Sequence, residues 1–308
     1  MGVGAGGGLP SGRGAMIGII GGGTMGLGIA VVLSAAGHEV VLFERDAAVR
    51  ASIPARLDAI AEEGARVSPK LLTVSGERDA VLTASLIIEA VPENLDIKQA
   101  LYADLFPLLP AETIIASNTS TMPPDMLAAR LPDAMAARLL VAHFWNPPYF
   151  LPLVEVLAGS RTDPGAMTAV VSLLADAGLK PVTLNRAVPG FIANRLQLAL
   201  VREALHLIET GVATAEVIDE VVLHSLGRRW SVTGPLQSAD LGGIHIFAAV
   251  SALLFPVLAN GQEGAALLAD MAASGRTGAR VNHGFYEWTQ ALHDDVARRR
   301  RLILGGPQ

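Results

Sequence analysis

The stretch IGIIGGGTMGLGIA, residues 17–30, constrains the fold of this chain more than any other segment. Its isoleucines predict a short buried strand, and the glycines that follow have the spacing G-x-G-x-x-G before a helical pattern over 24–36. A strand, a glycine turn and a helix in this order are typical of a loop that holds a pyrophosphate on free amide groups. The stretch therefore predicts a dinucleotide site formed by Gly21, Gly23, Thr24, Met25 and Gly26.

The same glycine spacing also occurs at Gly2, Gly4 and Gly7. No strand pattern precedes these glycines, and Pro10 follows them, so no helix N-terminus is predicted there. The glycine spacing alone therefore indicates little. The prediction of a dinucleotide site depends on the strand before the glycines and the helix after them. The glycine-rich residues 1–15 are expected to be a disordered tail, with either Met1 or Met16 as the natural start.

The segment HEVVLFE predicts the next strand and ends at Glu44. This position lies at about the 20-residue spacing at which an acidic residue binds the ribose hydroxyls of NAD. A carboxylate there would also repel the 2′-phosphate of NADP. Arg45 leaves an alternative open, because a neighbouring guanidinium can bind that phosphate. The segment favours NAD as the cofactor, with Glu44 and Arg45 beside the adenosine ribose.

Strand and helix patterns alternate along residues 16–186. This alternation predicts an α/β domain of the Rossmann type, with a doubly wound, mostly parallel sheet covered by helices on both faces. Its further strands are expected at 71–74, 86–91, 113–116, 139–143, 153–157 and 178–184, and its helices at 46–63, 93–105 and 163–177. The segment 86–91 is expected to be a continuous apolar strand.

The pattern changes at Pro189-Gly190, where a long helix over 191–210 begins that Gly211 should end. No convincing strand pattern follows. Residues 187–308 are therefore expected to form a separate all-α domain that closes a substrate cleft over the carboxyl ends of the strands. Its long apolar segments favour a homodimer.

Composition excludes several classes of function. The chain has 308 residues, a net charge of −6 and no cysteine, so neither nucleic acid nor a thiolate site is indicated. The seven histidines show no metal-ligand spacing, and no metal is expected. No signal peptide is recognisable, and the apolar run 246–259 is too short to span a bilayer. We expect a soluble, cytoplasmic protein that acts on a small molecule.

Polar residues follow several of the predicted strands. The segments 90–94 and 117–121 should face the cofactor at the carboxyl edge of the sheet, although both could instead cap helices. His143 ends one strand, and Glu155 interrupts another that is otherwise apolar. A buried carboxylate is costly unless it is paired. The two residues together suggest an imidazole base oriented by a carboxylate, although each alone is more often structural.

Several motifs in order resemble the 3-hydroxyacyl-CoA dehydrogenase family: GGGTMGLGIA, EAVPENLDIK, ASNTS, HFWNPP with LVEV, PGFIANRL, GPLQSADLGG and GFYEW. The resemblance implies NAD-dependent oxidation of an L-3-hydroxyl group, with His143 as general base and Glu155 orienting it. It also implies that Ser120 and Asn194 position the substrate oxygen. The implied cofactor contacts are Glu44, Ala90, Glu93, Lys98, Ser120 and Asn146. Two structural alternatives remain, since Asn194 could tie its helix to the first domain and Lys98 could lie on a solvated helix face.

Two departures from the family pattern bear on the substrate. The segment 44–89 is too short for the lysine-rich helical hairpin that contacts CoA in the acyl-CoA enzymes. SLGRRWSVTGP resembles the free-acid branch that contains the gulonate (lambda-crystallin-like) and carnitine dehydrogenases. Arg229 in this segment could clamp a substrate carboxylate, or Arg228 and Arg229 could be surface residues beside a buried Trp230.

The leading hypothesis is an NAD-dependent L-3-hydroxy acid dehydrogenase that acts on a small free acid. The nearest alternative is the same reaction on a CoA thioester. A hydrolase built on Ser120, His143 and Glu155 lacks the G-x-S-x-G elbow. A non-catalytic, crystallin-like NAD-binding protein is the remaining alternative, and the presence of both His143 and Glu155 argues against it.

Overall fold

A computed structural model describes residues 16–262 and 265–304 of the protein. The chain divides into two compact units, of which unit 1 comprises Met1–Phe191 with Val296–Gln308, and unit 2 comprises Ile192–Asp295. The sequence places the domain boundary at 186–187, slightly before this division. The tail predicted over residues 1–15 lies outside the described residues.

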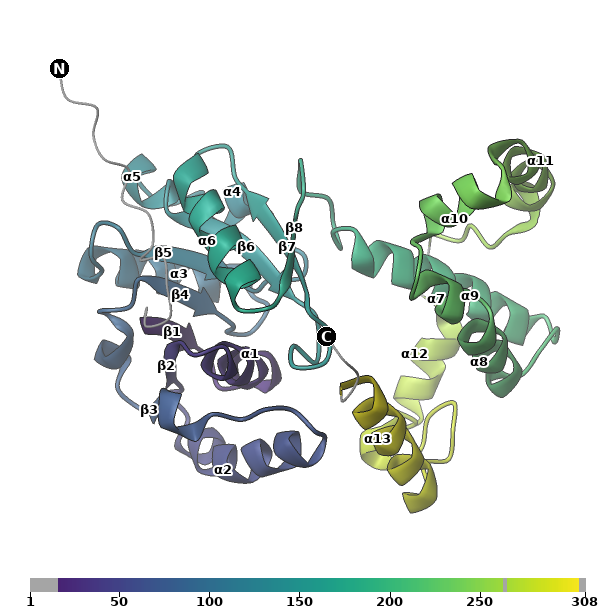
Figure 1. Ribbon diagram of the computed structural model, residues 1–308, viewed down its shortest axis with the longest axis horizontal. Coiled ribbons are helices and arrows are strands. Elements are labelled where there is room, and N and C mark those ends of the chain that lie inside the picture. Colours follow the sequence, from purple (N-terminus) through teal and green to yellow (C-terminus); the bar gives the residue numbers. More distant parts are fainter. Residues whose placement is uncertain (1–15, 263–264, 305–308) are drawn as a thin grey trace. The chain divides into compact units, whose positions relative to one another are not determined.

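Unit 1 is built on one eight-stranded sheet (Figure 1). The strand order is β3-β2-β1-β4-β5-β6-β7-β8. The strands are β1 (Met16–Ile20), β2 (Glu39–Phe43), β3 (Leu72–Ser75), β4 (Leu86–Glu89), β5 (Ile114–Ser117), β6 (Leu139–Phe144), β7 (Leu153–Ala158) and β8 (Lys180–Thr183).

Every neighbouring pair of strands is parallel except β6 and β7, which are antiparallel. The predicted Rossmann-type, mostly parallel sheet is therefore confirmed. The strand order reverses direction between β1 and β4, and such a switch point leaves a crevice outside the carboxyl ends of the strands. The carboxyl ends of β1, β4, β5 and β6 share this edge, so the loops after them are brought together.

The two faces of the sheet have separate apolar cores. Side chains of a strand point alternately to the two faces, and in β1 Ile17 and Ile19 join one core while Ile20 joins the other. Helix residues such as Leu27 complete the first core, and Tyr102 completes the second. Both faces are thus covered, as a parallel sheet requires.

Side chains cap the starts of three unit 1 helices, α2, α3 and α6. Asp46 accepts the amides of Ala48 and Val49, and Asp163 accepts those of Gly165 and Ala166. These caps explain why the predicted helices begin where they do. The helices are α1 (Thr24–Ala35), α2 (Ala47–Glu62), α3 (Leu95–Leu105), α4 (Pro124–Leu127), α5 (Asp133–Ala136) and α6 (Pro164–Asp176).

One strand differs from its prediction. β4 ends at Glu89, and this carboxylate is fully buried. The prediction of a continuous apolar strand over 86–91 is therefore wrong, because the buried strand carries a charged residue at its carboxyl end. The partners that make this burial possible are described with the site.

The described part of unit 2 contains helices and no named strand after β8. The first helix ends at Glu209, close to the predicted end, and Gly211 follows with a left-handed φ of 72°. The helices are α7 (Ala193–Glu209), α8 (Ala215–His224), α9 (Leu226–Trp230), α10 (Pro235–Gly242), α11 (Ile244–Leu254), α12 (Ala266–Ala273) and α13 (Gln290–Leu304), the last of which continues into unit 1.

Within the described residues, no single helix has both the length and the apolar composition needed to cross a membrane. The segments Pro235–Gly242 and Ile244–Val257 meet the criterion only as a pair, on length and composition alone, and the pair is bent by 112°.

Candidate active site

The glycine loop after β1 can exist only with glycines at two of its positions. Gly21 has a φ of 105°, and a Cβ atom there would lie 2.6 Å from the carbonyl oxygen of Ala90. A Cβ on Gly26 would lie 1.8 Å from the carbonyl oxygen of Gly21. A Cβ on Gly23, in contrast, would meet nothing within 4 Å. The loop is closely packed on its inner side and open at Gly23.

This open side lies at the first turn of α1, where Thr24 and Met25 provide early amide groups of the helix. The first amides of a helix have no intrahelical acceptor, and they attract anionic groups. The space at Gly23 and these donors together fit a pyrophosphate.

Glu44 is fixed beside the same loop, directly after β2. Its carboxylate accepts the amide of Gly22 at 2.7 Å and that of Asp46 at 2.8 Å. Arg56 donates to the carbonyl oxygen of Gly22 at 2.8 Å, so side chains bind both polar groups of this glycine. Arg45 is exposed. A carboxylate held at this place fits the two hydroxyls of an adenosine ribose.

His143 and Glu155 face each other across the antiparallel pair β6 and β7. They are direct cross-strand partners in its register, and opposite residues point to the same face of a sheet. Nδ1 of His143 lies 3.0 Å from Oε2 of Glu155, and both residues are buried. The strand register thus brings together two residues that are distant in sequence. Glu155 thereby gains the partner that a buried carboxylate requires.

Aromatic side chains enclose the imidazole. The ring centroids of Phe191 and His143 are 5.3 Å apart, and those of Trp145 and His143 are 6.3 Å apart. Phe191 is fully buried at a φ of 49°, a left-handed conformation uncommon for any residue but glycine. Phe191 is not among the predicted site residues, and its only signal in the sequence is its place after Pro189-Gly190.

The pair leaves one imidazole nitrogen for chemistry. Among the described residues, no group is hydrogen-bonded to Nε2 of His143, while Nδ1 is held by Glu155. His143 lies near the carboxyl end of β6, three strand positions from β1, a lateral distance of about 14 Å from strand spacing. An imidazole so placed can take a proton from a group bound at this edge of the sheet.

A second buried carboxylate, Glu89, is not among the site residues predicted from the sequence. It accepts hydrogen bonds from Nζ of Lys98 at 2.7 Å, Oγ of Ser117 at 2.7 Å, the amide of Val91 at 2.8 Å and the hydroxyl of Tyr102. Lys98 is itself only 1% exposed. The alternative that places Lys98 on a solvated helix face is therefore wrong, because α3 turns this side chain into the core.

Glu93 organises the loop after β5. One of its carboxylate oxygens accepts the amides of Ser120 and Thr121 at 3.0 and 3.2 Å, and the hydroxyls of Thr119 and Thr121. Partial burial raises the pKa of Glu93, but these hydrogen bonds and the charge of Lys98 outweigh it and place the pKa below its ordinary value. Glu93 is therefore an anion, and it fixes the backbone of Ser120.

The other predicted site residues fall in different places. Ala90 lies against Gly21, and Asn146 is exposed in the connection between β6 and β7. Asn194 is half-buried in the first turn of α7, and Arg229 is exposed on α9, both in unit 2. Trp230 is 41% exposed. The expectation of a buried tryptophan beside Arg229 is therefore wrong.

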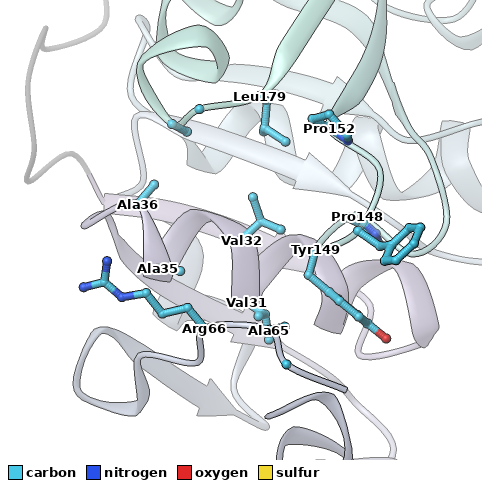
Figure 2. Close-up of a pocket in the computed structure, with 14 residues that line it drawn as sticks. Val31, Val32, Ala35, Ala36, Ala65, Arg66, Pro148, Tyr149, Pro152 and Leu179 are labelled. Carbon is cyan, nitrogen blue, oxygen red and sulfur yellow. The ribbon is translucent and has the colours of Figure 1, made fainter. Parts of the chain in front are cut away.

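A cavity of about 360 Å³ lies in unit 1 (Figure 2). Its walls come from the C-terminal half of α1 and from loops 64–66, 148–152 and 177–179, and they hold none of the predicted catalytic or cofactor residues. Tyr149 lines it and donates to Glu63 at 3.0 Å, and burial with the Glu63 charge raises its pKa to about 12. This cavity is therefore separate from the predicted catalytic and cofactor residues.

Comparison with known proteins agrees with this geometry. Residues 16–187 match the NAD-binding domain of 3-hydroxyacyl-CoA dehydrogenase, and residues 190–288 match the C-terminal domain of the same family. One curated relative is the 5-formyl-3-hydroxy-2-methylpyridine 4-carboxylate 5-dehydrogenase of Mesorhizobium japonicum, 35% identical over 94% of this chain and 98% of the relative. Another is the L-carnitine dehydrogenase of Streptomyces griseus, 41% identical over 73% of this chain and 68% of the relative.

Solved structures give the same result. A crystal structure of the 5-formyl-3-hydroxy-2-methylpyridine 4-carboxylic acid 5-dehydrogenase, described as an NAD+ dependent dismutase, matches with a TM-score of 0.86 and 31% identity over 95% of this chain and 99% of that one. The glycine loop and Glu44 fit NAD, which is named for the matched family domain and for the solved dehydrogenase structure. The chain belongs to the 3-hydroxyacyl-CoA dehydrogenase family and is an NAD-dependent dehydrogenase.

Proposed function

We propose that this protein interconverts a small L-3-hydroxy acid and its 3-keto acid. One observation carries the proposal: the buried His143 has Nδ1 bonded to Glu155 and leaves Nε2 for a substrate. The imidazole belongs to the sheet edge that also carries the glycine loop. A dehydrogenase needs this combination, because a proton and a hydride must leave neighbouring atoms of the alcohol.

In this mechanism Nε2 of His143 removes the proton of the substrate hydroxyl. Glu155 stabilises the imidazolium that forms, as a carboxylate at hydrogen-bond distance does for a histidine base. NAD held by the glycine loop and Glu44 would supply the acceptor for the hydride that leaves the carbon bearing the hydroxyl. Ser120 and Asn194 are proposed to hold the substrate oxygen, on the family resemblance. In the reverse direction, His143 donates the proton.

Two features support a free acid as substrate. Between β2 and β4 the chain forms one α-helix (α2), the short strand β3 and two short 3-10 helices, where the acyl-CoA enzymes carry a lysine-rich hairpin. Two relatives are named for small molecules, carnitine and a pyridine carboxylate. Arg229 is the proposed carboxylate clamp, since a guanidinium can bind a carboxylate with two parallel hydrogen bonds.

The substrate class is tested by measuring NADH formation with 3-hydroxybutyrate and related free acids against 3-hydroxybutyryl-CoA. The proposal predicts higher kcat/KM for a free acid, and a clear preference for the thioester would overturn it. Arg229→Ala should raise KM for the acid about tenfold through loss of a charge-assisted hydrogen bond. The adjacent Arg228→Ala serves as the matched control, and an equal effect of both variants would contradict the role of Arg229.

A second candidate is the oxidation of an aldehyde on a small aromatic carboxylate. The pyridine carboxylate 5-dehydrogenase matches nearly the full chain, and its name includes a formyl group. The hydrate of an aldehyde carries a hydroxyl whose proton His143 could remove in the same way. NADH formation from a pyridine carboxaldehyde that bears a carboxylate, without turnover of aliphatic 3-hydroxy acids, would favour this candidate.

We also propose that the protein forms a homodimer through unit 2. Helix α11 is apolar except for His245 and Ser251, yet none of its residues is buried, and Leu253 is 75% exposed. Such a helix normally has a covering surface. Light scattering should give twice the mass of one chain. Leu253→Glu should yield a monomer, and a monomeric wild-type protein would contradict the proposal.

A further inference from the structure

Lys98 is held between two carboxylates that differ in burial. Its Nζ atom lies 2.7 Å from Oε1 of Glu89, which is fully buried, and 3.5 Å from Oε2 of Glu93, whose side chain is 40% exposed. A third contact reaches the carbonyl oxygen of Val91 at 3.4 Å. The three donors of the ammonium thus have three acceptors. The cation links the buried Glu89 to the partly exposed Glu93.

Glu89 sits in a fixed position. Hydroxyl groups of Tyr102 on α3 and Ser117 on β5 donate to one of its oxygens, and Lys98 and the amide of Val91 donate to the other. These donors come from α3, β5 and the loop after β4, and they hold both oxygens of the carboxylate in place. Burial and the neighbouring Glu89 charge raise the pKa of Tyr102 well above its ordinary value, so this hydroxyl stays a donor.

Glu93 connects Lys98 to the loop that carries Ser120. Oε2 faces Lys98, while Oε1 accepts the amides of Ser120 and Thr121. A shift of Lys98 would move the charge that faces Glu93. Glu93 would then move relative to the loop whose Ser120 belongs to the proposed site.

We propose that Glu89 is a positioning residue, which through Lys98 and Glu93 fixes the Ser120 loop and the loop after β4 for the cofactor and substrate. The assignment of Ser120 rests on the proposed function. Glu89 itself has no room for a ligand, because it is fully buried and bonded to four donors. Its effect on turnover must therefore pass through the residues it holds.

The competing explanation is that the ion pair only stabilises the fold, and a double variant separates the two. Removing one member leaves an unpaired buried charge, whereas removing both restores charge balance. We would compare Glu89→Gln, Lys98→Met and the double variant with the wild type. Thr113→Val is the matched control, since Thr113 is also buried and bonded, to the carbonyl oxygen of Ala84, but precedes β5 at the opposite edge.

Each protein would be measured for Tm, for the Kd of NADH by fluorescence and for kcat. Both single variants should lower Tm, and the double variant should recover most of it. The double variant should nevertheless keep a kcat about tenfold below the wild type, because small displacements of positioned groups cost this much or more. Its Kd for NADH should stay several-fold above the wild-type value. Thr113→Val should lower Tm and leave kcat and Kd unchanged.

A double variant with wild-type Tm, kcat and Kd would overturn the proposal. If the double variant does not fold, Glu89→Asp decides the question, because it keeps the buried charge but withdraws it by one methylene. Reduced kcat with a near-native Tm supports positioning, and a wild-type kcat and Kd contradicts it. The measurement of the Kd of NADH needs no substrate. It therefore tests the positioning role of Glu89 even if the proposed hydroxy acid is not turned over.

Discussion

Glu89 and Glu155 are both buried carboxylates of one sheet, and they differ in the chemistry of their partners. Glu89 is bonded to an ammonium, two hydroxyls and an amide. Glu155 faces the imidazole of His143. An ammonium has only donors, whereas a neutral imidazole has one donor and one acceptor nitrogen. The first pair can only hold its surroundings in place, and the second can also move a proton.

This contrast shows how the role of a buried charge can be inferred. Burial alone does not separate the two residues, since both are nearly inaccessible. The separating feature is the spare capacity of the partner: Nε2 of His143 has no bonded group among the described residues, while the contacts of Lys98 match its three donors. Substitutions of the carboxylates at this sheet edge should therefore have effects of different size, and they should change different properties: kcat, kinetics with NAD, or stability.

The largest of these effects is expected for Glu155→Gln. The variant should lower kcat about a hundredfold, toward the lower end of what a general base contributes, because the imidazolium loses its counter-charge. The Kd of NADH should remain unchanged, since the glycine loop and Glu44 are intact. Steady-state kinetics and fluorescence titration test both parts. Glu39→Gln, at an exposed carboxylate that begins β2, is the control. An unchanged kcat in Glu155→Gln would contradict the claim that Glu155, unlike Glu89, takes part in proton transfer.

A smaller effect is expected for Glu44→Ala, whose carboxylate is half-buried and bonded to backbone amides. The variant should lower kcat/KM for NAD about tenfold, because the proposed ribose contact and the Gly22 anchor are lost together. The ratio of NADP to NAD activity should rise, since the repulsion of a 2′-phosphate is removed. Glu39→Gln, at an exposed carboxylate outside the glycine loop, should leave NAD kinetics unchanged. A preference for NADP in the wild type would contradict the role of Glu44.

The smallest effect concerns stability and Glu93. Its pKa in the folded protein is below the ordinary value of 4.5, so its contribution to stability is complete above that pH. The contribution is lost as the pH falls through the lower folded value. Glu93→Gln should therefore lower Tm slightly at pH 7. The loss of unfolding free energy should be less than about 1 kcal/mol, because the group is partly solvated. Thermal unfolding from pH 7 to pH 3 should show the difference shrinking, and a difference that grows on acidification would contradict it.

Much of the fold could be predicted because its signals are local. The glycine spacing lies in one short segment directly after β1, and the strands follow from short apolar runs. Caps such as Asp46 and Asp163 lie within three residues of the amides they bind. The pairing of His143 with Glu155 was also within reach, because a carboxylate in an apolar strand needs a partner and a histidine ended the preceding strand.

The Glu89 cluster was not predicted because its partners are distant in sequence. Lys98 and Tyr102 on α3 are 9 and 13 residues away, and Ser117 on β5 is 28 residues away. A signal was nevertheless present. Glu89 interrupts an apolar strand as Glu155 does, and Lys98 and Tyr102 are four residues apart on one face of a helix. The same rule applied to both strands would have raised the question of a partner for Glu89.

The central claim is that His143 moves the proton while other residues hold the cofactor. The most direct test is one experiment on His143→Gln that measures the Kd of NADH and the single-turnover rate of NADH formation with the preferred substrate. We predict an unchanged Kd and a rate about a thousandfold below the wild type, within the range for loss of a general base. A variant that retains the wild-type rate, or that loses NADH binding together with turnover, would contradict the account.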